Sequence, residues 1–161
     1  MKFVLDNTVG KLARLLRMAG FDTAYVAEDA ISRVIAISRE QERMIVSRNS
    51  RYEELTLVAA FHHVESDMPA EQLFALLSRL ALDLEEDRFL SRCLECNEPL
   101  EKVNKQEVAG HVWPYVWKTQ NEFRRCPGCA RIYWRATHVE AMQEKLMRIK
   151  SELDQMRRNR Q

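Results

Sequence analysis

The stretch Lys2-Phe-Val-Leu-Asp6 begins the chain with a short apolar run that stops at an acid. A continuous apolar run of this length is typical of a strand buried on both faces of a parallel sheet. Residues 8–19 follow with apolar side chains at helical spacing. Gly20 then predicts the end of that helix, because glycine adopts a positive φ angle at little cost. The stretch therefore predicts the first strand and helix of an α/β domain, with Asp6 at their junction.

The same alternation continues to about residue 82. The pattern predicts further strands at residues 23–27 and 44–47 and within 55–64, and further helices at 30–41 and 69–82. Strands that alternate with helices predict a mostly parallel sheet covered on both faces. We therefore expect an α/β domain over residues 1–85, followed by a charged linker at 83–92.

Two cysteine pairs dominate the second half of the chain. They are Cys93-Leu-Glu-Cys96 and, after 29 intervening residues, Cys126-Pro-Gly-Cys129. Each pair can present two thiolates from one tight turn, and two pairs complete the tetrahedral shell that zinc prefers. A shell of four thiolates is closed, so we expect structural zinc that supplies on the order of 10 kcal/mol of folding free energy.

The cysteines thus predict a zinc ribbon over residues 93–136. Redox-active or free thiol pairs and an iron centre are the alternatives to zinc at this site. His111 and His138 lie in or next to the ribbon. We expect structural roles for both histidines, because four thiolates leave no ligand position vacant.

Composition and charge narrow the class of protein. The 161 residues are 46% hydrophobic and 30% charged, as in a soluble globular protein. No apolar run approaches the roughly 18 residues of a membrane span, and Asp6 interrupts the only run near the N-terminus. We therefore expect a cytoplasmic protein without a membrane partner, in which cysteines stay reduced. Residues 1–92 carry a net charge of −3 and residues 93–161 a net charge of +4, which favours a basic module that binds a polyanion.

Polar residues follow each predicted strand. Asp6 ends the first strand, Asp29 precedes the second helix, Asn49 follows the third strand, and Asp67 follows the fourth. The carboxyl ends of parallel strands form the edge where open α/β sheets bind ligands. Oxygen ligands gathered there can hold Mg²⁺ or Mn²⁺ for phosphoryl chemistry. The alternative for Asp29 and Asp67 is a role as helix N-caps.

Basic side chains accompany both predicted sites and are candidates for binding the phosphates of a nucleic acid. The candidates are Lys11, Arg14, Arg17, Arg48, Arg124, Arg125, Arg131 and Arg135. The alternative is that they form solvated charged faces, which we favour for the stripe on the first helix. Aromatic residues of the ribbon can stack on unpaired bases. The alternative, which we favour for the aromatics, is that they form the small core of the ribbon. They are Trp113, Tyr115, Trp117, Phe123, Tyr133 and Trp134.

Several motifs in order resemble the Mut-seven C-terminal RNase family, a PIN-like nuclease domain followed by a zinc ribbon. The resemblance spans residues 2–148 and is carried by Phe3-Val-Leu-Asp6, Gly10-Lys-Leu-Ala-Arg14, Cys93-Leu-Glu-Cys96-Asn97, Arg125-Cys-Pro-Gly-Cys129 and Ile132-Tyr-Trp-Arg135. It implies a Mg²⁺- or Mn²⁺-dependent endoribonuclease in which Asp6 and Asp29 bind the metal.

One departure from this family pattern bears on catalysis. Where the family typically has aspartate after the third strand, this chain has Asn49. Asparagine offers a carbonyl oxygen but no negative charge to offset a divalent cation. The second hypothesis is therefore an RNA- or ribonucleoprotein-binding protein that keeps the nuclease fold with weak or absent catalysis.

A final helix is expected at residues 138–157. Its apolar residues recur at spacings of three and four, and they are Val139, Met142, Leu146, Ile149, Leu153 and Met156. The seam is shorter than the roughly three heptads that indicate a coiled coil. We expect the helix to pack on its own ribbon or α/β domain, and a homodimer or a docked partner protein is the alternative.

Overall fold

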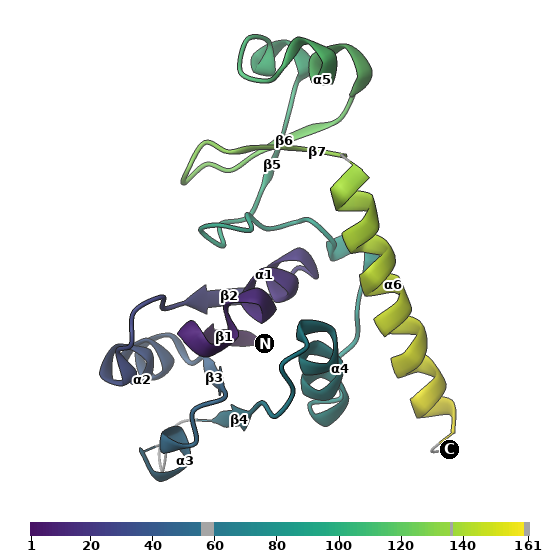
Figure 1. The fold of residues 1–161 in the computed structure, drawn as a ribbon. Helices are drawn as coiled ribbons and strands as arrows, with labels where there is room; N and C mark the ends of the chain where they lie inside the picture. Colours follow the sequence, from purple (N-terminus) through teal and green to yellow (C-terminus); the bar gives the residue numbers. More distant parts are fainter. Residues whose placement is uncertain (56–59, 136, 160–161) are drawn as a thin grey trace.

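The computed structural model of this chain describes residues 1–55, 60–135 and 137–159, with the side chains of Thr137 and His138 left aside. The role expected for the His138 side chain therefore lies outside the described part. A four-stranded sheet has the strand order β2-β1-β3-β4, and a separate three-stranded sheet has the order β5-β6-β7. Figure 1 shows the two sheets one above the other, with a long C-terminal helix beside both.

The first sheet is parallel throughout, which confirms the predicted α/β class. Its strands are β1 (Lys2–Leu5), β2 (Asp22–Tyr25), β3 (Met44–Ser47) and β4 (Phe61–His63). Its helices are η1 (Asn7–Val9), α1 (Gly10–Met18), α2 (Ile31–Gln41), α3 (Arg51–Leu55) and α4 (Pro69–Arg79). Strand β1 therefore lies inside the sheet, between β2 and β3.

One segment differs from the sequence prediction. The first helix opens with a 3-10 turn before α1, because the Asp6 side chain accepts a hydrogen bond from the Thr8 amide and caps that turn. The fourth strand lies within the predicted range 55–64, and Leu55 at the start of that range belongs to helix α3. The described part of that strand is β4, and residues 56–59 of the prediction lie outside the described residues.

Strand alternation divides the core between the two faces of the sheet. Phe3 and Leu5 of β1 face one side and belong to a large cluster that contains residues of α1 and α4. Val4 between them faces the other side and packs with Val34 and Tyr52 from α2 and α3. All three β1 side chains are fully buried, as expected for the interior strand of a parallel sheet.

The ribbon sheet is antiparallel and lies within the predicted range 93–136. Its strands are β5 (Glu101–Val103), β6 (Phe123–Arg125) and β7 (Ile132–Trp134). The connection from β5 to β6 holds the turn η3 (Lys105–Val108) and the short helix α5 (Pro114–Thr119). Figure 1 shows α5 at the end of the molecule farthest from the parallel sheet.

The C-terminal helix α6 (Thr137–Arg158) packs on its own chain, as expected. Val139, Leu146, Ile149 and Leu153 are buried in the cluster that also contains α1 and α4 residues. The apolar seam is therefore used within the chain, and a homodimer through this helix stays a prediction without support here. The predicted linker contains the turn η2 (Glu86–Arg88), and its Leu84 and Phe89 join the same cluster.

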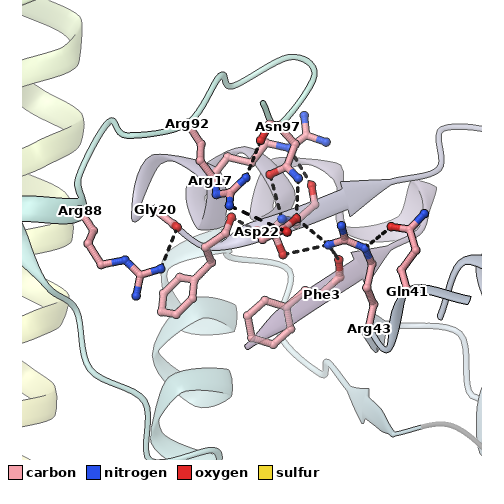
Figure 2. Close-up of polar contacts among 11 residues, drawn as sticks. Phe3, Arg17, Gly20, Asp22, Gln41, Arg43, Arg88, Arg92 and Asn97 are labelled. Atoms are coloured by element: carbon pink, nitrogen blue, oxygen red, sulfur yellow. Dashed lines mark hydrogen bonds and ion pairs between the residues drawn. The ribbon is translucent and has the colours of Figure 1, made fainter. Parts of the chain in front are cut away.

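A polar network fixes the ribbon to strand β2 (Figure 2). Asp22 accepts hydrogen bonds from Arg43 Nη1 at 2.6 Å and from Asn97 Nδ2 at 2.7 Å. Asn97 Oδ1 in turn accepts from the Thr23 amide at 2.9 Å, so this side chain continues the hydrogen-bonding pattern of the strand edge. The predicted helix end at Gly20 is confirmed, with a φ angle of +89°.

Arg17 of α1 forms the second half of this joint. Its guanidinium donates to the carbonyl of Thr23 at 2.9 Å and to those of Leu94 and Glu95 at 2.9 and 2.7 Å. Leu94 and Glu95 stand between the first two cysteines. The first cysteine turn is therefore held directly against the helix that begins beside Asp6.

Candidate active site and metal centre

The carboxyl ends of the parallel strands bring the four predicted acidic-site positions to one edge of the sheet. Asp6 directly follows β1, Asn49 comes two residues after β3, and Asp29 and Asp67 each come four residues after β2 and β4. Because all four strands run in the same direction, these positions share the edge at which ligands bind in open α/β folds.

Asp6 is the buried member of this set, with 5% of its surface exposed. One carboxylate oxygen accepts from the amide and hydroxyl of Thr8, at 3.1 and 2.5 Å. The other accepts from the Ser47 hydroxyl at 2.6 Å. Donors from two different strand ends therefore fix the orientation of this carboxylate.

Tyr52 adds a further hydrogen bond to Asp6 from helix α3. Burial, followed by the charge of Asp6 and the hydrogen bond to it, raises the pKa of Tyr52 above its ordinary value, and Asp29 adds to the effect. The phenol therefore stays protonated at neutral pH and keeps a donor for the carboxylate.

Asn49 is positioned beside this cluster but its side chain has another partner. The backbone N–H of Asn49 donates to Ser47 Oγ at 2.9 Å. Its side-chain Oδ1 accepts from the backbone N–H of Arg51 at 3.1 Å. That contact satisfies a free N–H at the start of α3. The oxygen expected to serve as a metal ligand is thus engaged in holding the local turn.

Asp29 and Asp67 are both exposed, and Asp67 forms an ion pair with Arg48. Within the described residues, only the four cysteines bring at least three Cys, His, Asp or Glu ligand atoms within 4.8 Å of one another. The expected acidic residues share an edge, but they do not form a gathered group.

A groove of about 580 Å³ adjoins this edge. Lys11 and Arg14 of the predicted basic stripe line it together with Thr8 and Asp67. Glu95 joins the ribbon to this groove through two ion pairs. Its Oε1 lies 3.2 Å from Arg14 Nη1 and 3.8 Å from Arg131 Nη1. Lys11, Arg14 and Arg17 therefore line one groove, and Arg131 of the ribbon approaches it through Glu95.

Other predicted RNA-binding residues are buried or have partners within the protein. Arg17 is buried at 5% exposure, so it is not part of an exposed stripe, and the sequence prediction is wrong for this residue. Half-buried Arg124 and Arg125 each donate to a backbone carbonyl at 2.9 Å. Arg135 is exposed and pairs with Glu140 at 3.3 Å.

The four cysteines form a compact thiol cluster without disulfides. Cys93 Sγ lies 3.6 Å from Cys129 Sγ, and Cys96 Sγ lies 3.3 Å from Cys126 Sγ. Zinc–sulfur bonds of about 2.3 Å in a tetrahedron require sulfur atoms about 3.8 Å apart. The donor set and its spacing therefore fit a zinc ion, and exposed His111 is not a member of the group.

Tyr133 supports this cluster from strand β7. Its hydroxyl oxygen accepts a hydrogen bond from the backbone N–H of Leu94 at 3.1 Å. The same oxygen lies 3.1 Å from Cys93 Sγ, so the hydroxyl can donate its proton to that sulfur. The Cys129 amide approaches Cys126 Sγ at 3.4 Å. Such donors orient thiolate ligands and offset part of their negative charge.

The sequence analysis missed the residues that hold Asp6 in place. Thr8 and Ser47 are short hydroxyl residues directly beside strand ends, and that position was the available signal. Tyr52 gave no local signal, because it reaches Asp6 only through the packing of α3 on the sheet. The contact between Asp22 and Asn97 gave no local signal either, because the two residues are 75 positions apart in the chain.

The fold and the two sites define a class of protein, a parallel α/β domain with a buried acid at its carboxyl edge and a four-cysteine ribbon. The family model described as Mut7-C RNAse domain matches residues 1–146, and the chain belongs to this family. The resemblance inferred from the motifs is thereby confirmed, and the family implies RNA as substrate. No curated protein and no solved structure matches the chain. No helix among the described residues is long and apolar enough to cross a membrane.

Proposed function

We propose that this protein is an endoribonuclease that uses Mg²⁺ or Mn²⁺ at the Asp6 edge of its PIN-like sheet. The observation that carries the proposal is Asp6 itself, buried and held by Thr8, Ser47 and Tyr52 at the edge beside a basic groove. A buried carboxylate held in one orientation at the ligand-binding edge of the sheet suits a metal ligand, and membership of an RNase family favours this role over helix capping alone.

Each residue at this edge has a separate role in the proposed reaction. Asp6 would ligate the cation, Asp29 would supply a second carboxylate, and Asp67 and Asn49 would contribute oxygens or bound water. A divalent cation there supplies an activated water and stabilises charge on the phosphoryl group. Lys11 and Arg14 would hold the RNA backbone in the groove, with Arg131 of the ribbon extending that contact.

Replacing Asp6 by asparagine is expected to lower the rate of RNA cleavage by at least about a hundredfold, since the variant removes the charge that binds the cation. Asparagine keeps the side-chain volume and one carbonyl acceptor. The measurement is cleavage of a labelled single-stranded RNA in Mn²⁺, with the melting temperature recorded for each protein. Asp87→Asn, an exposed acid of η2 away from the edge, is the matched control and is expected to keep the wild-type rate. Equal rates for wild type and Asp6→Asn would remove Asp6 from the mechanism.

A second candidate function is an RNA- or ribonucleoprotein-binding protein with weak or no catalysis. The observation that favours it is Asn49, which brings no charge and whose Oδ1 is already engaged by the Arg51 amide. The two candidates share the fold, the groove and the ribbon. They differ only in whether the Asp6 edge binds a divalent cation strongly enough for catalysis.

Asn49→Asp separates the two candidates. Aspartate also accepts from the Arg51 amide, so the variant adds charge while it preserves the local turn. We expect affinity for Mn²⁺, measured by calorimetry, to rise about tenfold, because a carboxylate near the cation contributes roughly 1–2 kcal/mol even in a watery site. Cleavage by the variant but not by wild type would support the second candidate. Cleavage by wild type that is lost in Asp6→Asn supports the first.

A further inference from the structure

Two aromatic residues of the ribbon lie outside its core. Trp113 and Tyr115 are 78% and 76% exposed, so the expectation that the ribbon aromatics form its core is wrong for both. Phe123, by contrast, is 2% exposed, as expected of a core residue. A large aromatic side chain gains roughly 1.5–3 kcal/mol from burial, so an indole exposed beside a hollow indicates a surface with a partner.

Trp113 is part of a built feature. A hollow of about 500 Å³ is lined by residues of the connection before α5 and by one residue of β7. Its walls carry two indoles, from Trp113 and Trp134, and the imidazole of His111. Flat ring systems from two separate elements of the ribbon therefore line one opening.

The position of Trp113 is fixed by its neighbours. Pro114 follows it, and a residue before proline is restricted to extended backbone, as observed here with φ −59° and ψ 142°. Helix α5 is anchored at its other end by Trp117, whose Nε1 donates to the Lys105 carbonyl at 3.1 Å. The backbone that carries Trp113 is thus held in place before any ligand arrives, which reduces the ordering cost of binding.

We propose that this hollow binds an unpaired base of RNA, with the indole of Trp113 as the stacking surface. The inference rests on the proposed action on RNA and adds to it a preference for single-stranded segments. Residues 108–121 contain no acidic side chain, but they do contain Lys118, and residues 93–161 carry a net charge of +4. A phosphate backbone is therefore attracted to this part of the ribbon, and aromatic faces accept any base.

The test measures binding of the zinc-loaded full-length chain to a labelled single-stranded oligouridylate and to a duplex RNA at fixed salt. Trp113→Ala is expected to weaken binding of the single strand about tenfold, because stacking on one aromatic side chain is lost. Binding of the duplex is expected to stay unchanged. Tyr115→Ala is the matched control, since Tyr115 is equally exposed but does not line the hollow, and it is expected to bind like wild type.

Three results would overturn the inference. The first is wild-type binding of the single strand by Trp113→Ala, and the second is an equal loss in Tyr115→Ala. The third is Trp113-dependent binding of a proline-rich peptide, which also suits aromatic grooves, without binding of oligouridylate. Cleavage that depends on Asp6 but not on Trp113 would leave the proposed function standing without the base site. Absence of both cleavage and RNA binding in wild type would remove the two together.

Discussion

The Cys126→Ala variant is expected to lose its zinc and the fold of the ribbon, with a fall of several kcal/mol in the free energy of unfolding. The reason is the small size of the ribbon core. Within the ribbon, Val108 and Phe123 are among the few fully buried apolar side chains apart from the cysteines themselves. A segment of about 40 residues rarely folds without a metal or disulfides, and a four-thiolate zinc site supplies on the order of 10 kcal/mol.

The measurements are metal content of protein purified without added zinc, and thermal unfolding followed by circular dichroism. We expect one zinc per wild-type chain and a lower melting temperature after chelation. Thr119→Ala, an exposed position of the same ribbon, is the matched control and is expected to keep its zinc. A metal-free Cys126→Ala protein that melts like wild type would show that zinc does not stabilise this fold.

The loss of zinc is also expected to destabilise the α/β domain. Arg17 donates to the carbonyls of Leu94 and Glu95, which lie inside the first cysteine turn. When that turn loses its metal, the carbonyls lose their fixed positions and the buried guanidinium loses two of its acceptors. Melting of the α/β domain is therefore expected to shift together with melting of the ribbon.

Replacing Arg17 by methionine is expected to lower the free energy of unfolding by about 3–5 kcal/mol. The variant keeps the apolar stem of the side chain and removes every donor. Three carbonyls in a buried joint then lose a charged partner, and breaking such a buried contact from one side leaves its polar groups unsatisfied.

Arg14→Met is the matched control for this measurement. Arg14 lies on the same helix one turn earlier, is exposed, and pairs with Glu95 at 3.2 Å. An exposed ion pair contributes at most about 1 kcal/mol, so Arg14→Met is expected to cost little stability. Urea unfolding of both variants distinguishes the positions, and equal losses would show that the joint at Arg17 adds nothing beyond a surface contact.

Much of the fold follows from signals within a few neighbouring residues. The apolar runs at residues 2–5 and 44–47 predicted strands with the observed bounds, and Gly20 marked the end of the first helix. The paired cysteines predicted a four-thiol cluster, because two ligands from one tight turn need only local geometry. The fourth strand was predicted within residues 55–64 without exact bounds, and β4 lies in that range.

The candidate site depended more on long-range packing. Asp6 and Asn49 were placed at the correct edge by strand order alone, but the acceptor role of Asn49 Oδ1 was set by helix α3. Sequence position could not show that Asp29 and Asp67 stay exposed and apart. Their distance from Asp6 depends on the loops after β2 and β4, which carry no periodic pattern.

The sequence by itself determined the class of this protein: a parallel α/β domain, a buried acid at its first strand end, and a metal-binding ribbon. Only the tertiary structure decided which members of each pattern serve which role. Arg14 and Arg17 share one helical spacing, yet Arg17 is buried against the ribbon whereas Arg14 stays exposed. Trp113 and Phe123 were equal candidates for the ribbon core, yet only Phe123 is buried. The physical reason is that periodicity reports neighbours along the chain, whereas burial depends on elements that pack from 70 or more residues away.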